Sequence, residues 1–196
     1  MKSKFLVFKS LLLLLIICAG FNSVVLANQG LQKGDKVPSF SANDQNGDLW
    51  QIDDHLGKDY MVIYFYPAAM TGGCTKQACG YRDNKSALNE LNIEVVGISA
   101  DPVNNLKIFK ESHNLNFTLL SDVNGDIARL FGVPIRQGSS FSTMIEDKTV
   151  NLSRAFSEAR WTFITDTAGK VVYIDTEVDA ENDSKNIMDF LNSMNK

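Results

Sequence analysis

Two segments that read as buried strands, 60–66 (YMVIYFY) and 93–99 (IEVVGIS), constrain the fold of this chain more than any other feature. Continuous runs of mainly β-branched and aromatic residues are typical of strands that are covered on both faces. Pro67 ends the first run, and the sequence predicts a helix over 75–91. A strand, a helix and a second strand in this order form a β-α-β unit, which places two parallel strands in one sheet.

The remaining segments continue this alternation. The sequence predicts a helix from Pro102 to about 113, a strand at 117–120, a short helix at 127–131, a hairpin formed by strands 161–165 and 171–174, and an amphipathic helix at 183–194. Residues 135–159 fit no regular pattern and are expected to form a functional flap or a mobile insertion. We therefore expect one α/β domain with a central mixed β-sheet flanked by helices on both faces.

The amino-terminal segment has the order of a secretory signal peptide. Three lysines within residues 1–9 precede an unbroken aliphatic run at 11–17, and small residues lead to Ala27. This order predicts a signal peptide over 1–27, cleaved near Ala27, and an exported domain over 28–196. An uncleaved membrane anchor and a lipid attached to Cys18 are the alternatives, although the apolar segment is near the lower length limit for a membrane span.

The charge of the chain excludes one class of partner. The whole sequence has 19 basic and 23 acidic residues, and 44% of it is hydrophobic, which is ordinary for a protein with a packed core. The first 27 residues contain three of the lysines and no acidic residue, so 16 basic and 23 acidic residues remain, with a net charge of −7. A domain this acidic has no basic surface for nucleic acid, so we expect no nucleic-acid partner.

Two cysteines, Cys74 and Cys79, belong to the predicted domain, and in an exported protein such a pair is usually a structural disulfide. Ideal helix geometry separates the Cα atoms of residues five positions apart by roughly 8.7 Å. A disulfide needs a separation of about 4.4–6.8 Å. If both residues lie in one helix, the bond forms only after the helix unwinds. This geometry favours a redox-active pair over a permanent one, and the structural disulfide remains the alternative.

The position of Cys74 favours a reactive thiolate. With Thr71 as the N-cap, Cys74 is the third residue of the helix and faces unpaired backbone N–H groups at the positive end of the helix dipole. Both features favour the charged form of sulfur. Gly72 and Gly73 leave neighbouring N–H groups open to a small polar substrate, and the Thr71 hydroxyl is within reach of the sulfur or of the group that it attacks.

Residues 64–83 (YFYPAAMTGGCTKQACGYRD) resemble the peroxiredoxins of the AhpC/TSA superfamily, and specifically their bacterioferritin-comigratory, or Q-type, group. Segments 34–40 (GDKVPSF), 97–101 (GISAD) and 160–164 (RWTFI) support the resemblance. The resemblance implies a thioredoxin-like fold. It also implies a thiol-dependent peroxidase that reduces hydrogen peroxide and small organic hydroperoxides without a metal or an organic cofactor.

The resemblance also assigns roles to individual residues. Cys74 matches the peroxidatic cysteine, which becomes a sulfenic acid, and Cys79 matches the resolving cysteine of the same subunit. Thr71 matches the threonine that hydrogen-bonds the peroxide, and Pro67 matches the proline that shields the thiolate. Arg160 matches the arginine that polarises substrate and sulfur, and spacing alone does not distinguish it from the other arginines. The implied partners are a peroxide and a thioredoxin-like dithiol reductant, and we expect a monomer or a weak dimer.

Three departures from the group leave the reductant open: Gly72 replaces a common proline, segment 135–159 is longer than usual, and export is less usual than a cytoplasmic location. A copper-delivery protein or a thiol-disulfide oxidoreductase on the same fold are the alternative functions. The copper carrier would need a histidine in a late loop, and the only histidines are His55 and His113. The oxidoreductase would have two residues between its cysteines, and this chain has four.

Overall fold

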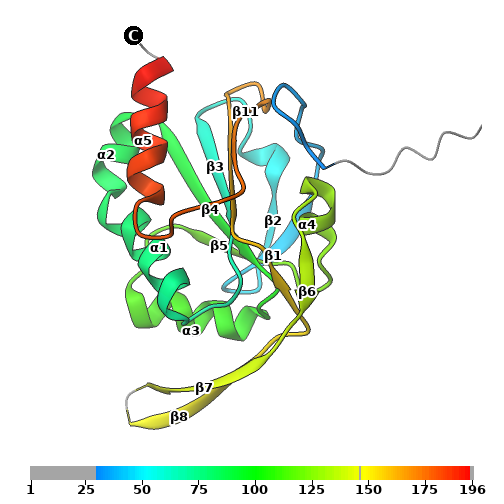
Figure 1. Ribbon diagram of the computed structural model, residues 1–196, viewed down its shortest axis with the longest axis vertical. Coiled ribbons are helices and arrows are strands. Elements are labelled where there is room, and N and C mark those ends of the chain that lie inside the picture. Colours follow the sequence, from blue (N-terminus) through cyan, green and yellow to red (C-terminus); the bar gives the residue numbers. More distant parts are fainter. Residues whose placement is uncertain (1–29, 146, 195–196) are drawn as a thin grey trace, which may run out of the picture.

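The computed structural model describes residues 30–145 and 147–194, and the predicted signal peptide lies outside them. A seven-stranded sheet in the order β11-β10-β3-β4-β5-β1-β2 forms the centre of the molecule (Figure 1). Its strands are β1 (Ser41–Asp44), β2 (Leu49–Gln51), β3 (Tyr60–Phe65), β4 (Ile93–Ser99), β5 (Thr118–Ser121), β10 (Trp161–Thr165) and β11 (Val171–Asp175). The helices are the short 3-10 helix η1 (Ile52–Asp54), α1 (Gly72–Asp83), α2 (Lys85–Glu90), α3 (Val103–His113), α4 (Asp126–Phe131) and α5 (Asp183–Met194).

The predicted β-α-β unit is confirmed at the centre of the sheet. Strand β3 runs parallel to β4, and β4 runs parallel to β5. On its other side β3 pairs with β10 in the antiparallel sense, and β10 and β11 form the predicted hairpin. The sheet is therefore mixed, and its interior strand β3 ends where the segment that leads to Cys74 begins.

Both faces of the sheet are covered, as predicted. Successive side chains of a strand point to opposite faces. Tyr64 accordingly joins one buried cluster with residues of α1, α3 and α5, whereas Phe65 joins a second cluster that includes Phe131 of α4. In Figure 1, helices α1, α2 and α5 lie together on one side of the sheet and α4 lies on the other. Within the described residues, no helix is both long and apolar enough to cross a bilayer.

The predicted helix over 75–91 is two helices. Helix α1 begins at Gly72 and α2 ends at Glu90, and Asn84 lies between the two with φ −91° and ψ 10°. The Asn84 side chain donates to the Gly80 carbonyl oxygen at 2.9 Å and to Ser184 Oγ of α5 at 3.1 Å. The backbone N–H of Asn84 keeps its helical bond to the same Gly80 carbonyl oxygen at 3.2 Å, so the side chain shares this acceptor and joins the break to α5.

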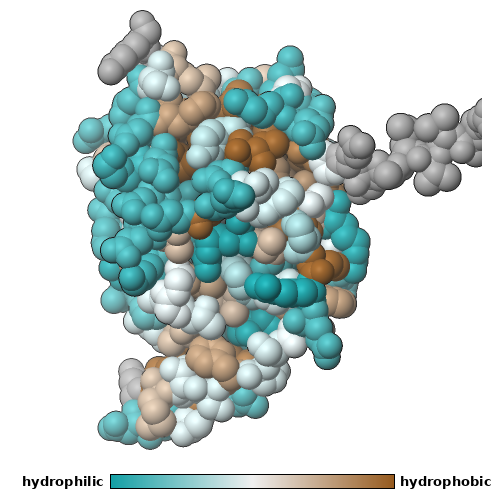
Figure 2. All heavy atoms as spheres, viewed as in Figure 1, coloured by the Kyte–Doolittle hydropathy of each residue, from teal (hydrophilic) through white to brown (hydrophobic). Residues whose placement is uncertain are grey.

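The expectation that residues 135–159 lack regular structure is wrong. They form four strands: β6 (Ile135–Gln137), β7 (Ser140–Ile145), β8 (Lys148–Ser153) and β9 (Phe156–Glu158). Strand β6 pairs with β9, and β7 pairs with β8 in a hairpin that projects from the domain (Figure 1). Figure 2 shows neutral and weakly hydrophobic residues along this hairpin, in contrast to the hydrophilic surface over α1 and α2. The facing backbone groups of β7 and β8 pair with each other, so the hairpin forms outside the central sheet.

Candidate active site

Cys74 is the third residue of α1, as predicted, with Thr71 as the N-cap in an extended conformation (φ −85°, ψ 151°). Its side chain is 1% exposed and belongs to the buried cluster between the sheet and helices α1, α3 and α5. The segment 66–71 connects β3 to α1, and within it Met70 has a φ of 67°. The end of β3 and the start of α1 therefore fix the position of the sulfur.

Arg160 contacts the sulfur of Cys74, with Nη2 3.3 Å from Sγ. The arginine precedes β10, and the first residue of β10, Trp161, pairs with Phe65 at the end of β3. The register of the sheet thus brings Arg160 to the segment that leads into α1. A Cβ atom at Gly73 would lie 3.3 Å from Arg160 Nη2, so glycine at this position leaves room for the guanidinium.

A chain of hydrogen bonds also fixes the guanidinium of Arg160. Its Nη1 donates to Gln77 Oε1 at 2.5 Å, and Gln77 Nε2 donates to Asp183 Oδ2 at 2.7 Å. The same Asp183 oxygen accepts hydrogen bonds from the Tyr81 hydroxyl at 2.6 Å and from Thr162 Oγ1 at 2.9 Å. Asp183 on α5 therefore orients the arginine that contacts the sulfur.

Burial raises the pKa values of Asp183 and Tyr81, two residues of this hydrogen-bond chain. Desolvation raises the pKa of Asp183 above its ordinary value of 3.8, and the hydrogen bonds from Tyr81, Gln77 and Thr162 oppose that rise. Desolvation also raises the pKa of Tyr81 well above 10.0, and the neighbouring Asp183 adds to the rise. The Tyr81 hydroxyl consequently keeps its proton and acts as a donor.

Sequence reasoning did not find Gln77, Tyr81 or Asp183. Gln77 and Tyr81 follow Cys74 at positions i+3 and i+7, which lie on one face of a helix, so the spacing within α1 carried a usable signal. Asp183 follows Gln77 by 106 residues, and no local pattern connects the two.

Thr71 and Pro67 lie close to Cys74 but make local contacts. The Thr71 hydroxyl donates to the Ala68 carbonyl oxygen at 2.8 Å and makes no capping bond to α1. The Pro67 carbonyl oxygen accepts a hydrogen bond from Ser157 Oγ at 3.1 Å. A pocket of about 410 Å³ is lined by Pro67, Pro134, Ile135, Arg136, Ala159 and Arg160. The structure thus brings two predicted site residues, Pro67 and Arg160, to one pocket, and Cys74 is not among the residues that line it.

Cys79 lies on the same helix as Cys74, and the two thiols are free. Cys79 is half-buried, whereas Cys74 is buried. Because α1 is continuous from Gly72 to Asp83, the two sulfurs belong to one intact helix. The prediction that a bond between them requires unwinding of α1 stays a prediction.

The two histidines make contacts of their own. His55 Nδ1 lies 2.8 Å from Glu94 Oε1, and its ring stacks on Trp50 at a centroid distance of 4.4 Å. His113 lies at the end of α3 and packs edge-on against Phe109. Over residues 30–145 and 147–194, no group of three or more His, Cys, Asp or Glu side chains is placed to hold a metal ion. These contacts give no support to the copper-delivery alternative.

The sheet is mixed and has helices on both faces, a cysteine lies in the first turn of a helix, and an arginine contacts its sulfur. These features define a protein of the thioredoxin-like class. The chain belongs to the AhpC/TSA family, whose family model matches residues 33–174. The relatives described below, which are proteins similar to this chain, confirm its resemblance to peroxiredoxins of the bacterioferritin-comigratory, or Q-type, group.

Two of these relatives are named peroxiredoxins. The chain is 47% identical over 103 residues to peroxiredoxin Bcp of Escherichia coli (strain K12), a match that covers 53% of this chain and 65% of that protein. It is 44% identical over 104 residues to the chloroplastic peroxiredoxin Q of Populus jackii, a match that covers 53% of this chain and 48% of that protein. The chain therefore aligns with about half to two thirds of the length of these relatives.

Solved structures confirm the fold. The crystal structure of peroxidoxin BcpB from Mycobacterium tuberculosis has a TM-score of 0.69 and 33% identity, and the match covers 84% of this chain and 98% of that one. A mutant PrxQ from Xylella fastidiosa has a TM-score of 0.71 over 85% of this chain and 98% of that one. At 18% identity, the second likeness supports the fold alone.

Proposed function

We propose that this chain is a thiol-dependent peroxidase that reduces hydrogen peroxide and small organic hydroperoxides. The contact between Cys74 Sγ and Arg160 Nη2, at 3.3 Å and at the amino-terminal end of α1, carries the proposal. The thiolate is the form of sulfur that attacks a peroxide, and here the sulfur lies beside a guanidinium and in the first turn of a helix. The peroxiredoxin names of the relatives support the same activity.

In the proposed first step, the Cys74 thiolate attacks one oxygen of the peroxide and the O–O bond breaks. The sulfur keeps that oxygen as a sulfenic acid, and the other oxygen leaves with a proton as water or as an alcohol. Negative charge develops on the leaving oxygen, and the guanidinium of Arg160 can donate to it. The bonds of Gln77 and Asp183 hold the guanidinium in place before the peroxide arrives.

In the proposed second step, the Cys79 thiolate attacks the sulfenic sulfur of Cys74, a disulfide forms and water leaves. We propose that the amino-terminal turns of α1 unwind for this step, because an intact helix keeps the two residues too far apart. A thioredoxin-like dithiol then reduces the disulfide with two electrons and restores both thiols. The half-buried position of Cys79 suits it to be the sulfur that the reductant meets first.

We further propose that the protein is exported and acts as a monomer or a weak dimer. The order of residues 1–27, with a basic region, an apolar region and a small-residue end, supports export. Within the described residues, one chain supplies Cys74, Cys79 and Arg160, so the proposed cycle needs no second copy.

Single-turnover kinetics of two serine variants test the assigned roles. Cys74→Ser should consume no peroxide, because it lacks the attacking sulfur. Cys79→Ser should consume one equivalent of peroxide and then stop, because its sulfenic acid has no resolving partner. Peroxide consumption and free thiols are measured after mixing reduced protein with one equivalent of hydrogen peroxide. Equal loss of the first turnover in both variants would contradict the assignment.

A further inference from the structure

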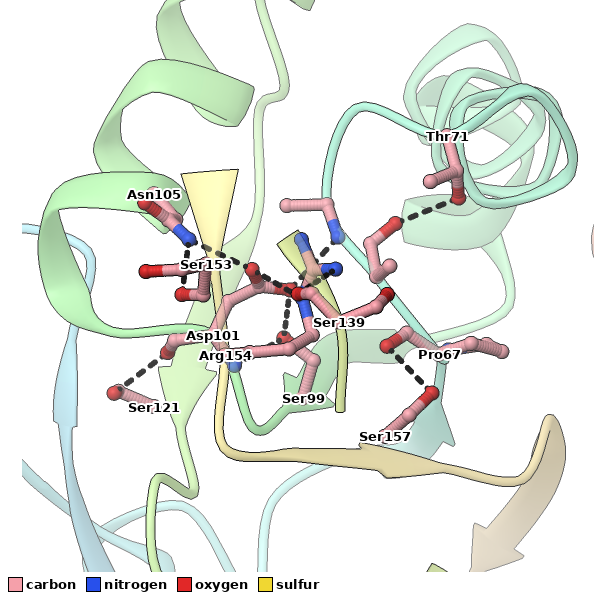
Figure 3. A network of polar contacts seen from close by, with 12 residues as sticks. Pro67, Thr71, Ser99, Asp101, Asn105, Ser121, Ser139, Ser153, Arg154 and Ser157 are labelled. Atoms are coloured by element: carbon pink, nitrogen blue, oxygen red, sulfur yellow. Dashed lines mark hydrogen bonds and ion pairs between the residues drawn. The ribbon is translucent and has the colours of Figure 1, made fainter. Parts of the chain in front are cut away.

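A buried ion pair lies where the β7–β8 hairpin joins the domain. Arg154 directly follows β8, and its Nε lies 2.9 Å from Asp101 Oδ1 (Figure 3). The two side chains are 1% and 0% exposed. Removing two charges from water has a large desolvation cost, and apolar residues can often replace such a pair without loss of stability. General stability is therefore a weak explanation for this pair.

The Asp101 carboxylate also binds the segment that leads to Cys74. Its Oδ2 accepts the backbone N–H of Ala69 at 2.7 Å. Its other hydrogen bonds come from the uncharged side chains of Ser99, at 3.1 Å, and Asn105, at 3.0 Å. Among the residues that the structure describes, Arg154 is the one charged group that pairs with this carboxylate. A single carboxylate thus connects the hairpin to the backbone of the active-site segment.

Further hydrogen bonds connect the same two regions (Figure 3). Asn105 Nδ2 donates to the Ser153 carbonyl oxygen at 3.1 Å, and Arg154 Nη1 donates to the Ser139 carbonyl oxygen at 3.4 Å. After the hairpin, Ser157 Oγ donates to the Pro67 carbonyl oxygen at 3.1 Å. Both ends of the hairpin are therefore bonded to the network that holds the segment 67–70.

The segment 67–70 needs this support. Met70 has a φ of 67°, a left-handed conformation that is unfavourable for a residue with a side chain and persists only where the surroundings impose it. Ala69, which Asp101 binds, directly precedes Met70, and Thr71, the N-cap of α1, directly follows it. The conformation of these residues sets where α1 begins and where Cys74 lies relative to Arg160.

We propose that Arg154 is a positioning residue for the peroxidase reaction: it holds Asp101, and Asp101 holds the segment 67–70 in the conformation that presents Cys74 to the peroxide. This inference rests on the proposed function. It makes the hairpin base a support of the active site and gives the insertion at 135–159 a role in the rate of the reaction.

The test measures the second-order rate constant of Cys74 with hydrogen peroxide by stopped flow in a Cys79→Ser background. Arg154→Met removes the charge and the donors, and it should lower the rate constant by roughly ten- to hundredfold, the size of effect that a displacement of about 1 Å can have. Arg154→Lys restores the charge and should recover part of the loss. The control, Lys148→Met, removes the same charge from the exposed far end of β8 and should stay within about twofold of the parent.

Two further measurements separate positioning from stability. Thermal unfolding of each variant shows whether the protein is folded at the assay temperature, and alkylation of Cys74 by iodoacetamide at pH 7 reports its reactivity without any peroxide. Positioning predicts that alkylation slows in Arg154→Met and recovers in Arg154→Lys. If Arg154→Met does not fold, Asp101→Asn, which keeps an acceptor for Ala69 but loses the charge, takes its place and should show the same slowing.

A folded Arg154→Met or Asp101→Asn protein with the parental rate constant and the parental alkylation rate would overturn the inference. So would a slow Arg154→Met protein that Arg154→Lys does not improve. If the parent protein consumes no peroxide, the proposed function fails, and the alkylation rates alone then decide whether Arg154 positions Cys74.

Discussion

At the scale of single residues, the sulfur of Cys74 depends on an arginine that lies 86 positions later in the chain. Arg160 makes two different bonds with its two terminal nitrogens, one to the sulfur and one to Gln77. A planar guanidinium can hold both groups at once, whereas a lysine ammonium has no such fork. The planar shape of the side chain therefore matters as well as its charge.

Arg160→Met should lower the second-order rate constant for hydrogen peroxide by roughly 10²–10³, the usual effect of losing one donor to a developing oxyanion. Arg160→Lys should remain well below the parent, because it keeps the charge but not the two bonds. Stopped-flow consumption of hydrogen peroxide measures both variants. A lysine variant with full activity would show that charge alone suffices.

Glu158 is a buried residue whose ionisation should limit stability at neutral pH. Its side chain is fully buried, and within the part of the chain that the structure describes its two carboxyl oxygens accept no hydrogen bond. Burial, and secondarily the nearby Asp122 carboxylate, raise the pKa of Glu158 well above its ordinary value of 4.5. The folded state therefore binds this proton more tightly than the unfolded state does, so stability falls as the pH rises above about 4.5 toward the raised pKa.

Glu158→Gln should remove this decline. We expect the free energy of unfolding of the variant to exceed that of the parent by roughly 1–3 kcal/mol at pH 8. This gap should narrow toward pH 4.5, because the Glu158 carboxyl is then largely neutral in the unfolded parent as well as in the folded one. Urea unfolding at several pH values measures the gap, and Glu177→Gln on the exposed surface is the matched control. A gap of constant size across this range would refute the ionisation argument.

The positions of the candidate site residues that lie close together in the chain could be predicted from the sequence. Cys74, Cys79 and Thr71 follow from the helix start and the spacing of the cysteines. Arg160 needed the family resemblance, because its approach to the sulfur depends on the pairing of β10 with β3. Asp183 could not be found, because its role depends on how α5 packs against α1.

At the scale of secondary-structure elements, α1 has two conflicting tasks in the proposed cycle. It would be intact when it presents Cys74 at its amino-terminal end, and it would open when Cys79 approaches. The bond from Lys76 to Glu181 at 2.7 Å joins two exposed side chains and would resist this opening little. The buried bonds of Gln77 and Tyr81 to Asp183 are the stronger attachment.

Oxidation should therefore loosen α1 locally. We expect amide hydrogen exchange across residues 74–82 to speed up when the protein is treated with one equivalent of peroxide, because the disulfide requires unwinding there. Exchange in α3, which carries no cysteine, should not change. Mass spectrometry of peptides from the reduced and oxidised protein measures the difference. Unchanged protection over 74–82 in a protein that has lost both thiols would eliminate the unwinding step.

Strands and helices could be predicted where their apolar residues pack into the hydrophobic core. The strands at 93–99 and 161–165 have the predicted bounds, because both are buried in the central sheet. The sequence did not predict β7, because SFSTMI departs from the alternation of polar and apolar residues at Thr143 and Met144 and its apolar positions are few. The Asn84 side chain at the break also donates to Ser184, which belongs to another helix, so no local pattern shows this contact.

At the scale of the whole molecule, the acidic domain and the composition of residues 1–27 fit an exported protein. In an exporting cell we expect the protein outside the cytoplasm, with its mass reduced by the loss of residues 1–27. Cell fractionation and mass spectrometry of the purified protein measure both. A full-length protein in the cytoplasmic fraction would refute export, and a full-length protein in the membrane fraction would support the anchor.

Asp183 connects the proposed opening of α1 to a buried carboxyl group that contains no sulfur. Two of the three donors to its Oδ2, Gln77 and Tyr81, lie on α1, and both would be lost if the proposed unwinding extends as far as Tyr81. A carboxyl group that stays buried and loses these donors binds its proton more tightly, because desolvation then acts without the hydrogen bonds that oppose it. Acid favours the dithiol in any such pair, and a proton taken up by Asp183 on oxidation would offset part of that preference.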